Sequence, residues 1–417
     1  MRGDRTRHDE GVRTLTDPGT GKSWSIGVNG GEVTVVTGGK TRTRSFGTAD
    51  EAREKASSDT WTKLKAGFVY ADPASVPESG AASEPAEFPT PTADPGPRPA
   101  VLLRHAGKGF SWLGDAALCA SEEDEAFFAV SMIGGANLVR RIDPDGTLTE
   151  VAELPAGRMV RSLSWYGDHL YADVDGQIMR IDPANADVEN LTDVPFLLGG
   201  SLRLAENLGV WHDGQDVVVT NLDTGDAVRR RPVETGQWQG HTPMLAMAVS
   251  TTHVAWCNDA ETIRIVSLAD GAEATLHKPA PELTDQLWLT ETGHLFTAGP
   301  YSTMARYDLA SGQREWTLTS QGGASDSVAE ATESTEGAGA TEGADITNIS
   351  MNRARTRLAV LMRAGTELRV IDAHSTATLD RLSPEYVVRS GGTAFTAAGL
   401  AVSTDYGCLA RYRLHSR

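Results

Sequence analysis

Short runs of alternating hydrophobic and polar residues recur along the chain from residue 138 to the C-terminus, and each run ends in a turn. In residues 177–181, Gln-Ile-Met-Arg-Ile, every second side chain would lie on one face of a β-strand. An Asp, Asn or Ser follows most of these runs, and a glycine often stands a few positions later, which is typical of tight turns. The pattern therefore predicts repeated strand, turn, strand units.

These units recur with a nearly constant period. Their turns follow residues Ile142, Ile181, Thr220, Val266, Tyr307, Ile371 and Tyr412. The spacing is about 40 residues, apart from one longer interval that contains an insertion. A period near 40 with strand-type content is typical of a β-propeller that has one four-stranded blade per repeat. We predict a mainly β protein with a seven-bladed β-propeller over residues 100–417.

The seventh copy needs a strand from elsewhere in the chain, because it ends at Arg417 without room for an outer strand. The short run at residues 100–105, Ala-Val-Leu-Leu-Arg-His, precedes the first blade and is apolar enough to fill that place. We expect it to close the ring, because closure removes open strand edges.

Residues 22–71 predict a separate small α+β domain that follows a disordered arm at residues 1–21. Alternating runs at 22–28 and 32–36 flank Asn29-Gly30-Gly31, which is a strong hairpin signal, and residues 40–46 would form a third strand. Thr48 and Glu51 form a capping box at the start of a helix, and Gly67 would end it.

This domain resembles the WGR domain of poly(ADP-ribose) polymerases and of bacterial multidomain proteins. The resemblance rests on Trp24, the Val-Asn-Gly turn, the basic strand ending in Phe46, the acidic helix start at 50–52 and the ending at 63–69. It implies nucleic-acid binding, but the aromatic residue and the arginine of the family's Trp-Gly-Arg triad are missing at residues 36–39. The basic strand is therefore the only part of the family's pattern that is retained here for contact with nucleic acid.

Lys40, Arg42 and Arg44 occupy alternate positions of that basic strand, so all three would lie on one face. Two interpretations remain open. The three cations form a weak phosphate-binding ridge, or they keep an edge strand soluble and unpaired.

The net charge of −18 is unevenly distributed, because residues 1–70 carry 12 Lys and Arg against 9 Asp and Glu while the rest of the chain is acidic. An acidic ring repels phosphate backbones, so any weak nucleic-acid contact should come from the N-terminal domain. The three cysteines show no paired spacing, and neither a signal peptide nor a membrane-spanning run is recognisable. We expect a cytoplasmic protein without a membrane contact.

Two segments are expected to lack regular structure. Residues 72–99 are rich in proline and should form an extended linker between two independent domains. Residues 321–345 consist largely of Gly, Ala, Ser, Thr and acidic residues and should form a disordered insertion between two blades.

Motifs for catalysis or cofactor binding are weak or incomplete. Residues 17–23 resemble the end of a phosphate-binding loop, but a strand follows where that motif needs a helix. The acidic clusters at 143–146 and 173–176 lack the later ligands of a calcium loop, so we interpret them as turns. Residues 308–316 resemble a quinoprotein-like repeat, but Trp316 recurs in no other copy, and the Trp-Asp signature of WD40 blades is absent. We predict no catalytic residue, cofactor or metal.

Trp238 and His241 lie in a connection of irregular length, and such loops often carry binding residues. We therefore predict them as protein-binding residues. The leading hypothesis is a non-catalytic scaffold that binds an unknown protein partner through a propeller face. The alternative is a nucleic-acid-associated protein that uses Lys40, Arg42 and Arg44, and an enzyme with its site on the ring axis is a third possibility.

Overall fold

A computed structural model provides the architecture of the chain. It describes residues 12–71, 100–107, 117–130, 137–156, 158–195, 197, 202–238, 242–279, 284–299, 304–318, 324–325, 346, 348–362, 367–382, 392–397, 399–404 and 407–414. Within these ranges, no helix has both the length and the apolar character that crossing a bilayer requires.

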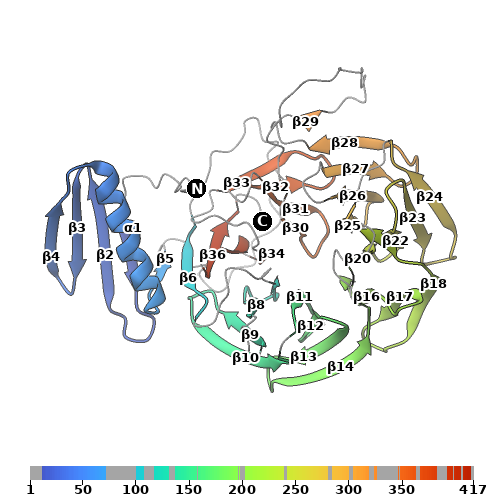
Figure 1. The fold of residues 1–417 in the computed structure, drawn as a ribbon, viewed down its shortest axis with the longest axis horizontal. Helices are drawn as coiled ribbons and strands as arrows, with labels where there is room; N and C mark the ends of the chain where they lie inside the picture. Colours follow the sequence, from blue (N-terminus) through green and yellow to red (C-terminus); the bar gives the residue numbers. More distant parts are fainter. Residues whose placement is uncertain are drawn as a thin grey trace, which may run out of the picture.

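The N-terminal unit is an antiparallel sheet covered on one face by a helix (Figure 1). Its elements are β1 (Arg13–Thr16), β2 (Ser23–Asn29), β3 (Glu32–Thr37), β4 (Lys40–Ser45), α1 (Ala49–Lys65) and β5 (Val69–Ala71). The strand order is β5-β1-β2-β3-β4. The expectation of a disordered arm up to residue 21 is wrong for β1, because this strand pairs with both β2 and β5 and buries Leu15 completely.

The helix begins and ends where its sequence predicts. The Thr48 hydroxyl accepts a hydrogen bond of 3.2 Å from the Glu51 backbone N–H, and Gly67 follows the helix with a positive φ of 97°. Ala52 and Leu64 are fully buried against β2 and β3, which stabilises the helix on the sheet. The helix and the sheet of the N-terminal unit therefore pack together through buried apolar residues.

A ring of antiparallel sheets forms the rest of the molecule (Figure 1). Six of these sheets are separate. Along the chain they are β7 (Leu118–Ala120), β8 (Ala126–Val130), β9 (Asn137–Ile142) and β10 (Leu148–Leu154); β11 (Val160–Tyr166), β12 (His169–Val174), β13 (Gln177–Asp182) and β14 (Asp187–Asp193); β15 (Arg203–Ala205), β16 (Leu208–His212), β17 (Asp216–Asn221) and β18 (Ala227–Pro232); β21 (Ala246–Val249), β22 (His253–Cys257), β23 (Thr262–Ser267) and β24 (Glu273–His277); β25 (Gln286–Leu289), β26 (His294–Ala298), β27 (Met304–Asp308), β28 (Arg314–Leu318) and β29 (Ala324–Ser325); β30 (Asn348–Met351), β31 (Arg357–Met362), β32 (Glu367–Asp372) and β33 (Thr378–Leu382).

The strands of the seventh sequence copy do not form a separate sheet. They are β34 (Thr393–Phe395), β35 (Gly399–Ser403) and β36 (Cys408–Arg413), and they belong to a nine-stranded sheet. The six separate sheets therefore do not confirm the predicted count of seven. The predicted closing strand is confirmed, because β6 (Leu102–His105) pairs with β36.

The nine-stranded sheet also joins the ring to the N-terminal unit. Its order is β34-β35-β36-β6-β5-β1-β2-β3-β4, and Tyr70 of β5 lies opposite Leu103 of β6. One hydrophobic cluster contains Leu15 and Trp24 of the N-terminal unit together with Leu103 and Tyr412 of the ring. The expectation of two independent domains is therefore wrong. The predicted linker at 72–99 lies outside the described residues.

The recurring Asp and Asn residues act in turns, as predicted. Asp182, Asn221, Asp308 and Asp372 each accept a hydrogen bond on the side chain from a backbone N–H two or three residues later. These local bonds begin the turn between the third and the fourth strand of a sheet. The same chemistry explains Asp17, which accepts a hydrogen bond of 3.0 Å from the Gly19 N–H in the turn between β1 and β2.

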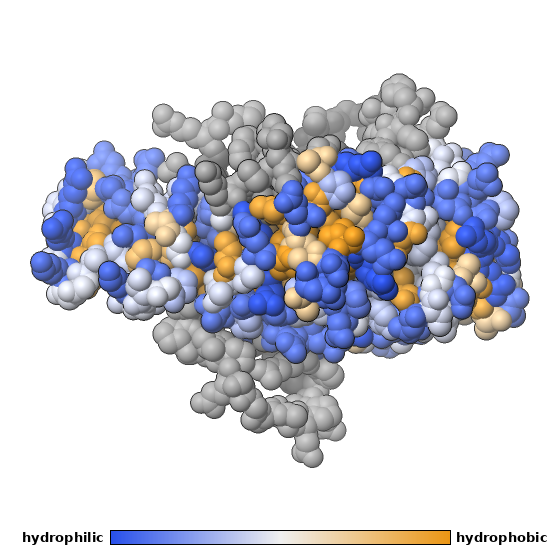
Figure 2. All heavy atoms as spheres, turned by 90° about the horizontal axis from the view of Figure 1, so that it is seen from below, coloured by the Kyte–Doolittle hydropathy of each residue, from blue (hydrophilic) through white to orange (hydrophobic). Residues whose placement is uncertain are grey.

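Two connections between sheets carry additional strands. A two-stranded hairpin, β19 (Gly236–Trp238) and β20 (Thr242–Met244), stands between β18 and β21. In the predicted disordered insertion, residues 324–325 form β29, which pairs with β28, and the other residues of 321–345 lie outside the described part. Seen edge-on, the described part of the molecule is a flat disc, and the N-terminal unit extends it at one end (Figure 2).

Candidate functional site

A central cavity of about 1250 Å³ is the first candidate. It is lined by the first strand of each of the six separate sheets and by β34. Successive sheets are connected at one face of the ring, and the first turn within each sheet lies at the other face, because neighbouring strands are antiparallel. We refer to these as the connection face and the turn face.

An arginine-rich turn lies at the turn face of the cavity, and its side chains reach other sheets of the ring. This turn, residues 352–356, joins β30 to β31. The Arg355 guanidinium donates hydrogen bonds of 2.6 Å to the carbonyl oxygens of Leu204 and Leu289, which belong to the sheets of β15 and β25. Arg353 forms ion pairs with Glu122 and with Glu206. These contacts connect four sheets across the ring axis.

Arg355 is held in an environment that is unusual for an arginine. Its φ of +57° lies in the left-handed region, which is costly for a residue other than glycine. Burial lowers the pKa of its guanidinium to about 10, and the charge of Glu291, 3.5 Å away, opposes this shift. Arg355 thus remains charged at neutral pH. The two carbonyl oxygens and Glu291 compensate for its desolvation.

The wall of the cavity near the connection face carries a second charged group. Asp285 directly precedes β25, and one of its carboxylate oxygens is buried without a hydrogen-bond partner in the structure. Burial raises the pKa of Asp285 to about 6, while the Arg203 charge counteracts the shift. A raised pKa is common at active sites, but it also arises in structural ion-pair networks. Neither Asp285 nor Arg355 was predicted from the sequence, because neither stands in a recognisable catalytic or binding motif.

One of the two predicted protein-binding residues, Trp238, belongs to a two-stranded hairpin. Trp238 ends β19 and lies opposite Thr242 of β20, so it stands beside the tip of this hairpin. Its side chain and His241 are outside the described atoms. Gly236 is required here, because a Cβ at this position would lie only 1.8 Å from the Asn258 carbonyl oxygen. The Asn258 side chain donates a hydrogen bond of 2.8 Å to the Glu234 carbonyl oxygen and holds the hairpin at the connection face.

The predicted basic residues lie together on β4, far from the central cavity (Figure 1). Lys40, Arg42 and Arg44 are exposed and lie opposite Thr37, Val35 and Val33 of β3. The structure therefore places them on one face, as their alternate spacing predicts. β4 is also the last strand of the nine-stranded sheet, so its outer edge is free of a neighbouring strand in the described residues.

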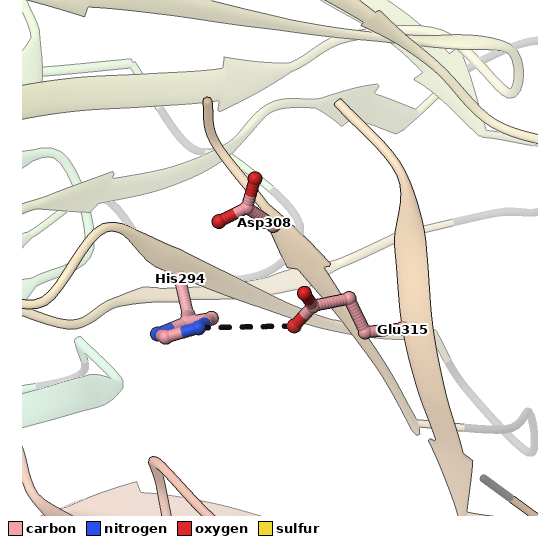
Figure 3. A group of neighbouring side chains, drawn as sticks. All are labelled: His294, Asp308 and Glu315. Carbon is pink, nitrogen blue, oxygen red and sulfur yellow. Dashed lines mark ion pairs between the residues drawn. The ribbon is translucent and has the colours of Figure 1, made fainter. Parts of the chain in front are cut away.

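One cluster has the composition of a metal site. His294 of β26, Asp308 of β27 and Glu315 of β28 point toward one another (Figure 3), and one potential ligand atom from each lies within 4.8 Å of the others. Metal-ligand spacing in the sequence did not indicate this group, because the three residues come from three strands.

Existing contacts favour an ion-pair cluster over a metal centre. The Arg306 guanidinium lies 2.9 Å from a Glu315 oxygen, closer than the His294 ring nitrogen at 3.7 Å. Asp308 already accepts hydrogen bonds of 2.7 Å from the backbone N–H and the hydroxyl of Ser311. Burial, followed by the Arg306 charge, lowers the pKa of His294. A divalent ion would have to compete with Arg306 for Glu315.

The three thiols offer no reactive site in this structure. Cys119, Cys257 and Cys408 are free and buried, and burial raises the pKa of each. A buried thiol with a raised pKa is a poor nucleophile, because the reactive form is the thiolate.

Comparisons with known proteins support the fold and give no family. No protein-family model matches the chain, and no curated protein matches its sequence. A chain in a crystal structure of the mitotic checkpoint complex is 12% identical with a TM-score of 0.52, and the match covers 80% of this chain and 98% of that one. Raptor from Chaetomium thermophilum is 14% identical with a TM-score of 0.51, and the match covers 73% of this chain but only 28% of Raptor.

Together with the ring of sheets, these neighbours show that the chain has a β-propeller fold. At such low identities, the likeness extends to the fold alone. The resemblance of residues 22–71 to the WGR domain receives no support from the family comparison.

Proposed function

We propose that this protein is a non-catalytic scaffold that binds another protein through the connection face of its propeller. In this proposal β34, β35, β36 and β6 serve as a seventh blade, and the N-terminal unit is an accessory contact module. The structural neighbours support the general role, because one of them comes from a multiprotein assembly. Propellers commonly use a rigid ring to position variable connecting loops for binding.

The β19–β20 hairpin is the observation that carries the proposal. It adds a two-stranded sheet outside the four-stranded blades, and it is fixed to the ring by the contact between Asn258 and Glu234. Trp238 stands next to the hairpin tip. An aromatic side chain is a typical anchor for a protein partner, because it buries a large area at a small entropic cost.

The central cavity supports a structural role better than a catalytic one. Arg353 and Arg355 occupy its turn face and are engaged by carbonyl oxygens and carboxylates. Asp285 has a raised pKa, but a nucleophile and a second positioned acid or base are not found beside it among the described lining residues. We therefore assign the cavity to ring stability.

Affinity capture from the native host tests this function with matched variants. The bait would be the full chain, its Trp238→Ala variant and a Tyr166→Ala control, which changes an aromatic residue at the end of β11 on the turn face. We expect a partner that the wild type and the control retain and that Trp238→Ala loses. Equal capture by all three baits, or no enriched protein, would contradict binding through the hairpin.

A further inference from the structure

The outer edge of β4 combines a regular strand with an open pairing position. All six residues from Lys40 to Ser45 are exposed, and they pair with β3 in an uninterrupted antiparallel register. β4 is the terminal strand of the nine-stranded sheet and lies at the free end of the molecule (Figure 1). Figure 2 shows hydrophilic residues around a group of hydrophobic ones at this end of the disc. Such an edge presents backbone N–H and C=O groups to any strand that fits it.

The two faces of β4 differ in chemistry. Arg42 and Arg44 lie opposite Val35 and Val33, so they share the face that α1 covers over β2 and β3. Hydroxyl groups occupy the opposite face. There the Thr43 hydroxyl lies 3.1 Å from that of Thr34, and the Ser45 hydroxyl donates to Glu32 at 3.3 Å. The edge therefore alternates cationic and hydroxyl positions.

The charges of this edge are not neutralised within the described part of the chain. No ion pair or hydrogen bond engages the side chains of Lys40 and Arg42 there, and the only described side-chain contact of Arg44 is with the Phe46 ring, whose centre is 5.2 Å away. The other arginine-rich strand, β18, behaves differently: Arg230 pairs with Asp213 at 2.7 Å, and Arg229 donates to the Leu268 carbonyl oxygen. Unneutralised cations are notable in a chain with a net charge of −18.

We propose that β4 binds an acidic extended peptide of a partner protein, which adds a strand to the sheet. This inference rests on the proposed function, because it specifies the contact made by the accessory module. Opposite charges facing each other across two strands are stabilising, and like charges are destabilising. The sequence that fits best alternates Asp or Glu with Ser or Thr, placing acids opposite the cations and hydroxyls opposite Thr41, Thr43 and Ser45.

A second copy of this chain is disfavoured as the occupant of the edge. Pairing two β4 strands would bring two rows of Lys40, Arg42 and Arg44 together across the new interface. The free backbone edge also favours a peptide over a nucleic acid, because strand pairing uses N–H and C=O groups that a nucleic acid cannot match in register.

Fluorescence anisotropy of the full-length protein with a labelled peptide of alternating Glu and Thr tests the proposal. We expect saturable binding that weakens at least about tenfold in Arg42→Glu, which replaces an attraction with a repulsion. Arg53→Glu is the matched control, because it makes the same charge change on α1 of the same unit, where Arg53 pairs with Asp50. Equal weakening in both variants would overturn the proposal, since it would show attraction by net charge alone.

Two N-methylated versions of the peptide test the strand pairing itself. Methyl groups on alternate residues remove either the N–H groups that face β4 or those that face away, so only one version should lose binding. Retained binding by both versions, or loss by both, would overturn strand addition. Tighter binding of single-stranded DNA, with displacement of the peptide, would favour the nucleic-acid interpretation instead.

Partner capture separates a failure of this inference from a failure of the scaffold function. If Arg42→Glu still captures the partner that depends on Trp238, while the peptide does not bind the wild type, only the assignment of β4 is wrong.

Discussion

The Arg355 guanidinium donates a hydrogen bond of 2.6 Å to the Leu204 carbonyl oxygen, 151 residues earlier in the chain. The bond spans the axis of the ring, because Arg355 lies in the turn after β30 and Leu204 lies in β15. A second bond of 2.6 Å reaches the carbonyl oxygen of Leu289 in β25. One side chain thus links three sheets of the ring.

Replacing Arg355 with Met should destabilise the ring by about 2 kcal/mol, because two partly buried carbonyl oxygens lose a charged donor. The midpoint of urea unfolding measures this change. Arg353→Met is the control. Its side chain is 47% exposed and its ion pairs lie at the surface, so the loss should stay below about 1 kcal/mol. A loss at Arg355 no larger than at Arg353 would show that the cross-ring contact is unimportant for stability.

Removal of residues 1–71 should lower the melting temperature of the ring and promote aggregation. The deletion exposes the edge of β6, where Leu102 and Leu103 are each only 3% exposed in the intact protein. Differential scanning calorimetry should show one cooperative transition for the full chain. Two separate transitions, with a ring that melts at the same temperature after the deletion, would indicate independent domains.

Acid should weaken the junction between the N-terminal unit and the ring through His105. Burial, with smaller contributions from Lys65, Arg104 and Arg140, lowers the pKa of His105 to about 4. Its ring lies edge-on to Trp61 of α1, with 5.5 Å between the ring centres. Between pH 6.5 and 4 the unfolded chain binds a proton that the folded chain excludes. The stability that His105 contributes is therefore complete above pH 6.5 and is lost as the pH falls toward 4.

Melting temperatures at pH 7.5 and pH 4.5 measure this effect in the wild type and in His105→Gln. The comparison between the two proteins removes the contribution of the other titrating groups. We expect the wild type to lose more stability than the variant over this interval. The same loss in both proteins would show that His105 titrates normally in the folded chain.

The cluster of His294, Asp308 and Glu315 should not bind zinc tightly, because Arg306 and Ser311 already engage its carboxylates. An excess of Zn²⁺ should leave the melting temperature of the wild type unchanged. Arg306→Leu removes the competing cation 2.9 Å from Glu315 and should make any zinc response larger. A substantial zinc-dependent rise in the wild type, abolished by His294→Ala, would instead identify a metal site.

Local sequence patterns were sufficient to predict much of the fold. The turns at Asp182 and Asp308, the helix start at Thr48 and the closing strand at 102–105 all depend on short-range signals or on a repeated period. The join between β5 and β6 carries no such signal, because the residues of 72–99 separate the two strands in the chain. The proline-rich composition of residues 72–99 suggested that the two domains are separate. The pairing of β5 with β6 instead joins them in one sheet.

The candidate surfaces were predictable only in part. The alternation of Lys40, Arg42 and Arg44 was enough to place them on one face, but their position at the end of a nine-stranded sheet required the structure. Arg355 and the cluster around Glu315 depend on contacts between residues that are distant in sequence or on neighbouring strands. No motif encodes such contacts, so composition and spacing could not identify them.

Native mass spectrometry of the tagged protein, purified gently from its host, tests the scaffold function most directly. One chain has a mass of 44.4 kDa. We predict a species whose mass is not a multiple of this value, because it contains a different protein, and we predict that Trp238→Ala reduces its abundance. Only the single chain and its multiples, at every protein concentration tested, would contradict the proposal that this propeller binds a partner.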